Sequence, residues 1–274
     1  MAQRRDFTGK VVVVTGAGSG IGAALARRFA KAGSHVVLLD RDGEAAGAVA
    51  AAIASRGGSC RPMACDVTDE AAVRHTISAV VAEAGGIDVL VCNAGITHRS
   101  LLADTDVAVY RRVMDVNVFG ALHCTKAALA SLVERRGLLV VTSSIAGIAP
   151  LYERTGYAAS KHALHGLFGS LRTELFGTGV DVMLVCPSFT STGIGRAALD
   201  GRGEAASHEQ STVGRVATPE SVADAVFEGA RRSRRLLVLT PVGKLTALLS
   251  RLWPALYEKL MARSIRREIA RHSG

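Results

Sequence analysis

The sequence has few aromatic residues, few prolines and no long uninterrupted apolar run. Only 4% of its 274 residues are Phe, Trp or Tyr, although 49% are hydrophobic, so the core must consist of Ala, Val and Leu with much Gly. This composition excludes a disordered chain and a collagen-like chain. No stretch reaches 18 consecutive apolar residues, and we therefore expect no segment that spans a membrane.

The cysteines do not form a recognisable framework. They are odd in number, none has the CxxC spacing, and several fall within apolar, strand-like runs: Cys60, Cys65, Cys92, Cys124 and Cys186. This pattern predicts reduced, buried thiols and a cytoplasmic location rather than a disulfide-bonded secreted protein. We also expect no secretory signal in the first residues.

The net charge of +9 belongs to one end of the chain. Residues 231–274 carry 11 Lys and Arg against two acids, whereas bases and acids balance over the preceding 230 residues. The main body therefore offers no general attraction to an anionic partner, and no aromatic platform for nucleic acid accompanies the basic end.

Strand-like and helix-like segments alternate along the chain. Expected strands are 10–15, 35–40, 60–65, 87–92, 137–142 and 180–185, with a short last strand at 235–239. Expected helices are 21–32, 70–84, 106–134, 156–176 and 219–230, together with an Ala-rich helix that follows the second strand and ends near residue 55. Such βα units without a linker predict a single-domain α/β fold. We expect a doubly wound parallel sheet of about seven strands with helices on both faces, over residues 1–240.

A glycine-rich loop follows the first expected strand and opens the first expected helix. It reads Gly-x-x-x-Gly-x-Gly over Gly16, Ser19, Gly20, Ile21 and Gly22. Glycines there allow a tight turn and let backbone N–H groups approach a pyrophosphate at the helix N-terminus. In this position the loop predicts dinucleotide binding.

Two charged residues at the end of the second strand bear on the choice of cofactor. Asp40 lies 18 residues past Gly22, where a carboxylate can accept hydrogen bonds from the adenosine ribose and repels a 2′-phosphate. We therefore expect NAD to be preferred. Arg41 keeps NADP possible, because a cation next door can bind that phosphate.

Polar residues follow other strands at the same edge of the sheet. Asp66 and Val67 come after the third strand, and the run Asn93, Ala94 and Gly95 comes after the fourth. Ligands bind at the carboxyl ends of strands in open α/β sheets. Singly, each of these residues also suits a turn or a helix cap.

A tyrosine and a lysine four residues apart lie on one face of an expected helix. A cation near Tyr157 favours its phenolate, and Lys161 with a bound nicotinamide cation could lower the phenol pKa toward 7. Ser144, just after the fifth strand, could donate to a substrate oxygen beside the tyrosine. Asn117 falls inside a long helix, where Asn is usually only exposed, but it could hold a water that relays protons to Lys161.

In order and spacing, Thr15–Gly22, Asn93–Gly95, Asn117, Ser144, Tyr157 and Lys161 resemble the compact, single-domain branch of the short-chain dehydrogenase/reductase family, over about residues 7–240. The resemblance implies an NAD(P)-dependent oxidoreductase that interconverts a secondary alcohol and a carbonyl compound. Tyr157 would be the acid/base, and Lys161 would lower its pKa while holding the nicotinamide ribose. Ser144 would orient the substrate carbonyl, and Asn117 would complete the proton relay.

The resemblance also implies a homodimer or homotetramer and no catalytic metal. After the sixth strand the family usually has Pro-Gly, whereas this chain has Pro187 followed by Ser188. Pro187 and Thr192 still match, and we expect Thr190 and Thr192 to contact the nicotinamide carboxamide. Serine lacks the conformational freedom of glycine, which puts the path of this loop in question.

The expected pocket walls are residues 145–152, the residues after Asn93 and the loop 188–215, and the first of these walls is mainly apolar. Residues 145–152 favour a hydrophobic substrate that is steroid-, lipid- or terpenoid-like, although His98, Arg99 and Arg154 could also reach the pocket. Two functions of other classes stay open: a non-catalytic dinucleotide-binding redox sensor or scaffold, and a membrane-surface adaptor.

Residues 241–274 form an expected basic amphipathic helical extension. Leucines and isoleucines recur there every three or four residues, and Pro254 should divide the segment into two helices. The apolar stripe could pack on the enzyme body or a sister subunit, or it could lie on an anionic membrane surface. This ending is loosely similar to those of members near the hydroxysteroid dehydrogenases.

Overall fold

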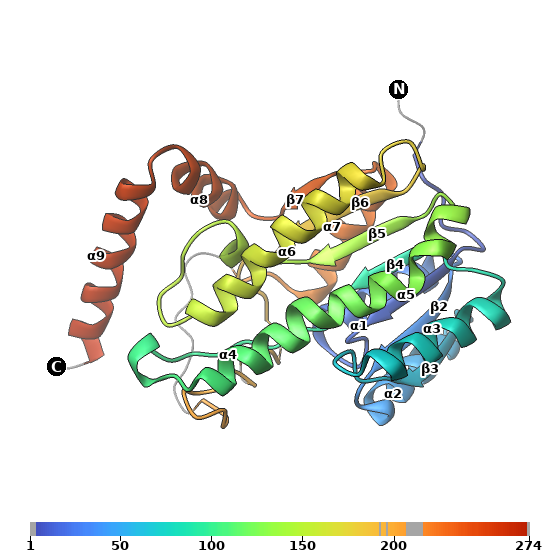
Figure 1. Ribbon diagram of the computed structural model, residues 1–274, viewed down its shortest axis with the longest axis horizontal. Helices are drawn as coiled ribbons and strands as arrows, with labels where there is room; N and C mark the ends of the chain where they lie inside the picture. Colours follow the sequence, from blue (N-terminus) through green and yellow to red (C-terminus); the bar gives the residue numbers. More distant parts are fainter. Residues whose placement is uncertain (1–3, 192, 196, 207–215, 273–274) are drawn as a thin grey trace.

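Seven parallel strands form one sheet at the centre of the molecule (Figure 1). The structure, a computed structural model, describes residues 4–191, 193–195, 197–206 and 216–272. The strands are β1 (Val11–Thr15), β2 (His35–Asp40), β3 (Ser59–Ala64), β4 (Val89–Cys92), β5 (Leu138–Thr142), β6 (Asp181–Cys186) and β7 (Leu236–Val238). Their spatial order is β3-β2-β1-β4-β5-β6-β7, so the winding direction reverses between β1 and β4.

Helices cover both faces of this sheet. On one face lie α1 (Gly20–Lys31), α2 (Gly43–Ala54) and α7 (Pro219–Arg231); on the other lie α3 (Glu70–Ala84), α5 (Gly120–Glu134) and α6 (Thr155–Glu174). The shorter α4 (Val107–Met114) precedes α5 and packs on α6. The single-domain, doubly wound α/β fold expected from the alternating pattern is confirmed.

The sequence of the first strand shows why the sheet is buried on both sides. In β1, Val12 and Val14 belong to the core cluster that contains α1 and α7, whereas Val11 and Val13 belong to the opposite cluster. Successive side chains of a strand point to opposite faces, so a strand covered on both faces becomes a run of apolar residues. Polar caps then fix the helix starts: Asp42 accepts a hydrogen bond from the Ala45 N–H at 2.9 Å, ahead of α2.

The helical stretch expected at 106–134 contains a local irregularity. Residues Asp115–Phe119 form a π-helical turn between α4 and α5. The whole stretch from Val107 to Glu134 is long and apolar enough to cross a membrane, but half of its most apolar window is buried within the protein. It is therefore a core helix of the fold.

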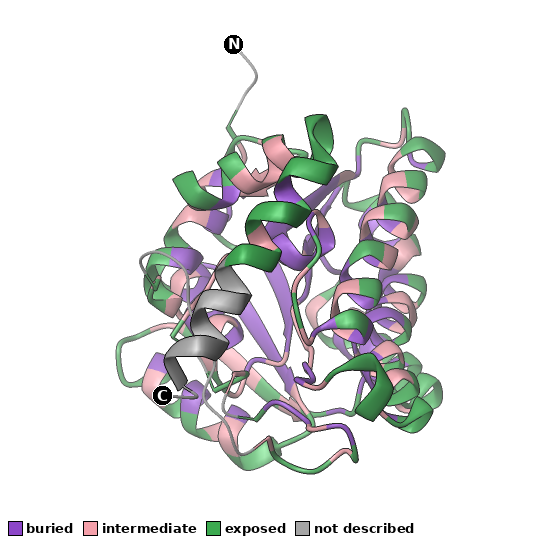
Figure 2. Cartoon of the chain, turned by 90° about the vertical axis from the view of Figure 1, so that its left-hand side faces the viewer, coloured by how far each residue is buried: buried purple, intermediate pink, exposed green. Residues whose placement is uncertain are grey.

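Two helices beyond the sheet, α8 (Pro241–Leu252) and α9 (Pro254–His272), meet at Trp253, with Pro254 as the first residue of α9. The division at Pro254 occurs as expected. Figure 2 shows the coloured part of this pair as largely exposed, in front of the buried strands. The side chains that are 46–55% exposed include Val242, Leu245, Leu248, Leu252, Trp253, Leu256 and Leu260.

The helical pair is fastened to the body near residues 145–150. Tyr257 is buried and donates its hydroxyl to the Pro150 carbonyl at 3.2 Å, and Ser250 donates to the Ile148 carbonyl at 3.4 Å. The pair is thus attached to the body through Tyr257 and Ser250, whereas Leu245, Leu248, Leu252, Leu256 and Leu260 of the apolar stripe are half exposed.

Candidate active site

A cleft of about 540 Å³ lies at the carboxyl edge of the sheet, where the strand order reverses. Asn93, at the end of β4, connects this strand to β1, on the other side of the reversal. Its backbone N–H donates to the Thr15 hydroxyl at 2.9 Å, and its side-chain amide donates to the Thr15 carbonyl at 3.1 Å. Such a switch point is where ligands bind in doubly wound sheets.

The glycine loop after β1 forms a concave surface, called the glycine cradle below, that side chains in place of its glycines would fill. Gly16 has φ +62°, in the left-handed region. A Cβ on Gly22 would collide with the Gly16 carbonyl oxygen and would lie 2.6 Å from the Asn93 amide nitrogen. Ser19, the N-cap residue of α1, makes no side-chain capping bond with the described residues. The first-turn N–H groups of α1 are thus well placed for an anion such as a pyrophosphate.

Asp40 is positioned at the end of β2 by two backbone N–H groups. One carboxylate oxygen accepts from Gly18 at 2.8 Å and the other accepts from Asp42 at 3.0 Å. These contacts fix the carboxylate in the cleft and tie it to the glycine loop. Arg41 lines the same end of the cleft.

Asp66 lines the cleft near Arg41. Hydrogen bonds from the Thr68 N–H and hydroxyl, together with the nearby Arg41 guanidinium, lower the pKa of its carboxyl group. Asp66 therefore stays ionised at neutral pH, so this end of the cleft holds a fixed negative charge beside Asp40.

Tyr157 and Ser144 meet on the other side of the cleft. Burial raises the pKa of the Tyr157 phenol, and a hydrogen bond from Ser144 and the charge of Arg154 oppose that rise. Desolvation of the phenolate outweighs these favourable contacts, and the lowering expected from Lys161 together with a bound nicotinamide cation stays a prediction. The phenol is therefore protonated at neutral pH.

Lys161 is buried one helical turn beyond the tyrosine. Its ammonium lies 5.7 Å from the Tyr157 ring centroid and donates to the Thr142 carbonyl at 2.8 Å. Burial lowers the pKa of Lys161 to about 8, because a charged ammonium loses its hydration there. The ammonium is thus close to its titration point just above neutral pH.

Asn117 is buried within the π-helical turn, contrary to the usual exposure of Asn in helices. Its side-chain oxygen accepts from the Ile96 N–H at 2.8 Å, and its amide donates to the Ile96 carbonyl at 3.0 Å and to the Ser160 hydroxyl at 2.9 Å. Ser160 in turn donates to the Tyr157 carbonyl at 2.7 Å. Asn117 thus braces the segment after β4 against α6, and the water relay stays a prediction.

Most residues expected to bind the cofactor line this one cleft: Gly16, Ser19, Gly20, Ile21, Asp40, Arg41, Asp66, Val67, Asn93, Ala94, Gly95, Tyr157, Lys161, Pro187 and Thr190. Gly22 and Asn117 are not among its lining residues, and Thr192 lies outside the described residues. The lining residues that the sequence analysis did not single out include Asp42, Ala45 and Val116. The position of Asp42 could have been predicted, because an Asp at the start of a helix is a typical N-cap residue.

Ser188 adopts a backbone conformation that does not need glycine. Among the described residues, Arg136, Glu153 and Ser233 are those other than glycine with positive φ, and Ser188 is not one of them. Its hydroxyl lies 2.6 Å from the Thr240 hydroxyl, at the N-cap of α8. The serine therefore connects the loop after β6 to the first of the two C-terminal helices.

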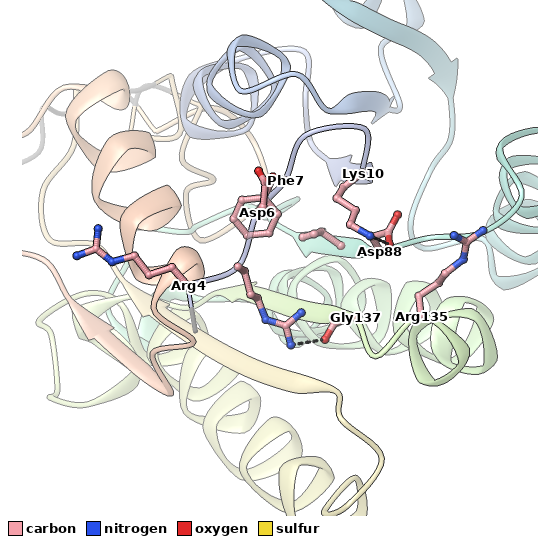
Figure 3. Close-up of a pocket in the computed structure, with 9 residues that line it drawn as sticks. Arg4, Asp6, Phe7, Lys10, Asp88, Arg135 and Gly137 are labelled. Carbon is pink, nitrogen blue, oxygen red and sulfur yellow. Dashed lines mark hydrogen bonds and ion pairs between the residues drawn. The ribbon is translucent and has the colours of Figure 1, made fainter. Parts of the chain in front are cut away.

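A smaller hollow of about 300 Å³ contains Asp88, Lys10, Arg4, Arg5 and Arg135 among its lining residues (Figure 3). Arg5 binds Asp181 at 2.8 Å, Lys10 binds Asp88 at 3.1 Å, and Arg135 donates to a backbone carbonyl. These charges hold the N-terminal segment and the ends of strands together. We therefore assign the chemistry to the larger cleft.

Comparison with known proteins gives the family. The sequence profile described as short chain dehydrogenase matches residues 10–202. The chain belongs to the short-chain dehydrogenase family. The motif residues of the cleft from Gly16 to Thr190 lie within the matched segment, whereas α7, β7 and the helices α8 and α9 follow it.

Relatives of this short-chain dehydrogenase cover most of its length. It is 33% identical to "Dehydrogenase/reductase SDR family member 7B" of Danio rerio, over 98% of this chain and 89% of the relative. It is 36% identical to the meso-2,3-butanediol dehydrogenase of Serratia marcescens, over 79% and 85% of the two chains. A short chain dehydrogenase/reductase from Burkholderia phymatum, crystallised with NAD, is 27% identical, with a TM-score of 0.82 and coverage of 92% and 96%.

Proposed function

We propose that this enzyme interconverts a secondary alcohol and a ketone with NAD as hydride acceptor, and that Tyr157 is its acid/base. The observation that carries the proposal is that Tyr157, Ser144 and Lys161 line the same cleft as the glycine cradle and Asp40. The structural neighbour named as an NAD complex and the relative named as a butanediol dehydrogenase support it.

The residues of the cleft fit a dinucleotide. The cradle around Gly16 and Gly18 would hold the pyrophosphate, and Asp40 would accept hydrogen bonds from the adenosine ribose, which favours NAD over NADP. Lys161 and the segment Asn93–Gly95 would hold the nicotinamide half. When bound, NAD supplies the acceptor for the substrate's hydride.

Side chains of the protein carry out the proton transfer that accompanies the reaction. Tyr157 is protonated at neutral pH in this structure, which suits donation to a carbonyl oxygen during reduction. In the oxidative direction its phenolate must form, and the nearby charges of Lys161 and Arg154 favour it. Ser144, which hydrogen bonds to Tyr157, can hold the substrate oxygen next to the phenol so that the proton moves over a short distance.

The substrate side of the cleft suits an apolar molecule. Ile96, Ile145, Leu151, Phe189 and Ile194 line it, and burying an apolar group against such walls contributes about 25 cal/mol per Å². We therefore infer a hydrophobic alcohol or ketone of the size of a steroid, lipid or terpenoid fragment.

The experiment is a turnover assay with a matched pair of serine variants. Wild-type protein is mixed with NAD and a panel of apolar secondary alcohols, and with NADH and the corresponding ketones, while NADH absorbance is followed. Ser144→Ala should lower kcat/KM by about 100-fold, the usual loss of a donor to a reacting oxygen. Ser143→Ala should change it less than tenfold, because that hydroxyl donates to the Lys161 carbonyl instead.

A negative result would discriminate between the functions. If NADH binds but no alcohol or ketone in the panel turns over, the non-catalytic sensor becomes the better account. Equal losses in the two serine variants would remove the role assigned to Ser144.

A further inference from the structure

A buried arginine stands at the substrate end of the cleft, and the reaction itself does not require it. Arg154 is the N-cap residue of α6, three residues before Tyr157, so the two side chains lie on the same side of the helix start. Its side chain is only 8% exposed, yet it lines the cleft.

The guanidinium of Arg154 has hydrogen-bonding capacity that the described protein does not use. One terminal nitrogen of the guanidinium donates to the Thr97 hydroxyl at 2.7 Å. Within the part of the chain that the structure describes, this is the only hydrogen bond of the guanidinium. A guanidinium carries five N–H donors. No nitrogen of Arg154 is among the buried unpartnered side-chain atoms of the described residues, and Arg154 lines the cleft, so its remaining N–H groups are open to a ligand there.

The surrounding charges leave the substrate end positive. The acids among the described lining residues are Asp40, Asp42 and Asp66, which lie at the ends of β2 and β3, whereas Arg154 lies three residues before Tyr157. Burial lowers the pKa of Arg154, and Arg99 lowers it further, while Tyr157 and Glu153 raise it. Arginine nonetheless stays charged in proteins.

Apolar walls surround this cation. Ile96, Leu151 and Ile194 line the same cleft as Arg154, so a molecule that fits this cleft and matches Arg154 combines an apolar body with one oxygen-rich, anionic group. A carboxylate matches the planar fork of a guanidinium with two parallel hydrogen bonds, and bonds of this type are among the strong ones.

We propose that Arg154 binds a carboxylate of the substrate, so that the enzyme acts on an apolar hydroxy acid or oxo acid. This inference rests on the proposed function, because it places the reacting oxygen at Tyr157 and the acid group at Arg154. It narrows the substrate class from hydrophobic alcohols in general to those that also carry an acid.

The first arm of the test measures selectivity. Hydroxyoctanoates with the hydroxyl at each position from 2 to 7 are compared with their methyl esters as substrates for NAD reduction. At one or more spacings, wild-type kcat/KM should favour the acid over its ester by 10- to 100-fold, as expected for a hydrogen-bonded charge pair. Arg154→Met should bring that ratio close to one, and Arg154→Lys should restore part of it.

The acid-to-ester ratio separates recognition from a general effect of Arg154. Arg154 also lowers the pKa of Tyr157, so its loss can slow both substrates, but such an effect cancels in the ratio. Thr97→Val is the matched control, because it removes the arginine's protein partner and leaves the charge in place. Its ratio should stay within threefold of wild type.

The second arm measures binding without turnover. Calorimetric titration with octanoate, in the presence of NADH, should show binding that weakens at least tenfold in Arg154→Met, whereas octanol should bind both proteins equally. Octanoate binding that does not depend on Arg154, or an acid-to-ester ratio near one in wild type, would overturn the inference while leaving the proposed function intact. Arg154-dependent binding without any NAD reduction would instead contradict the proposed function.

Discussion

The preference for NAD can be tested at Asp40, whose surroundings allow the effect to be estimated. Both carboxylate oxygens accept backbone hydrogen bonds, from Gly18 at 2.8 Å and from Asp42 at 3.0 Å. A carboxylate offers about four acceptor positions, so two are left for ribose hydroxyls. Asp40→Asn removes the charge and turns one acceptor into a donor at nearly the same volume.

We expect this substitution to weaken NADH binding by 10- to 100-fold. A hydrogen bond to a charged group contributes about 1.5–3 kcal/mol, and tenfold in affinity corresponds to about 1.4 kcal/mol. NADPH binding should tighten instead. Two like charges about 5 Å apart repel by roughly 3 kcal/mol at an effective dielectric constant of about 20, and the variant removes this repulsion from the 2′-phosphate.

The assay is fluorescence titration of the wild-type and variant proteins with NADH and NADPH at one salt concentration. Asp42→Asn is the control: it lies in the same part of the cleft and caps α2 through the Ala45 N–H, a role that Asn fills equally well. Its selectivity should match wild type. Tighter NADPH binding by the wild-type protein, or equal changes for both cofactors in Asp40→Asn, would refute the reasoning and assign the choice to Arg41.

Three further predictions concern pH, the glycine cradle and the C-terminal helices. Burial, with Arg154 nearby, lowers the pKa of the fully buried His98 to about 4, so its contribution to stability is complete above the unfolded value of about 6.5 and is lost as pH falls toward 4. Between pH 7 and pH 5 wild type should lose about 2 kcal/mol more unfolding free energy than His98→Gln; equal losses would contradict this. In urea unfolding, Gly22→Ala should lower the free energy of unfolding by at least about 1–3 kcal/mol, because the added Cβ overpacks the glycine loop. Gly47→Ala, in open space on α2, should raise it by up to about 1 kcal/mol. An unchanged free energy of unfolding in Gly22→Ala would show that the glycine loop is loosely packed. Because half-exposed leucines of the C-terminal helices lie beside basic residues, we expect the protein to float with anionic vesicles and Leu248→Glu to abolish this flotation. The control is Phe176→Glu, at an apolar residue that is 91% exposed beyond α6, and it should float like wild type. If Leu248→Glu instead changes only the oligomeric state in light scattering, packing on a sister subunit is favoured.

The sequence was sufficient wherever local pattern decides the structure. The valine run of β1 marks a strand buried on both faces, and the glycine loop after it must turn tightly into α1. Pro254 has no N–H to donate within a helix, so α8 ends before it and α9 starts with it. These features depend on neighbours within a few residues of the chain.

Features that depend on distant segments could not be predicted. Asn117 is buried because the backbone of Ile96, 21 residues earlier, hydrogen bonds to its amide. Ser188 finds its partner at Thr240, and no local spacing relates the two. The desolvation that raises the pKa of Tyr157 is a property of the folded cleft. Arg154 was recognised as able to reach the pocket, but its unmatched donors became visible only in the structure.

The most direct test of the central claim replaces Tyr157 with Phe and follows NADH in single-turnover reduction of a ketone that wild type accepts. Loss of the hydroxyl should lower the rate at least 100-fold, as for loss of a general acid, with NADH affinity unchanged within threefold. Tyr110→Phe is the control, because its hydroxyl pairs with Thr155 at the start of α6; this variant should keep most of the rate. A Tyr157→Phe protein whose rate stays within tenfold of wild type would contradict Tyr157 as the acid/base.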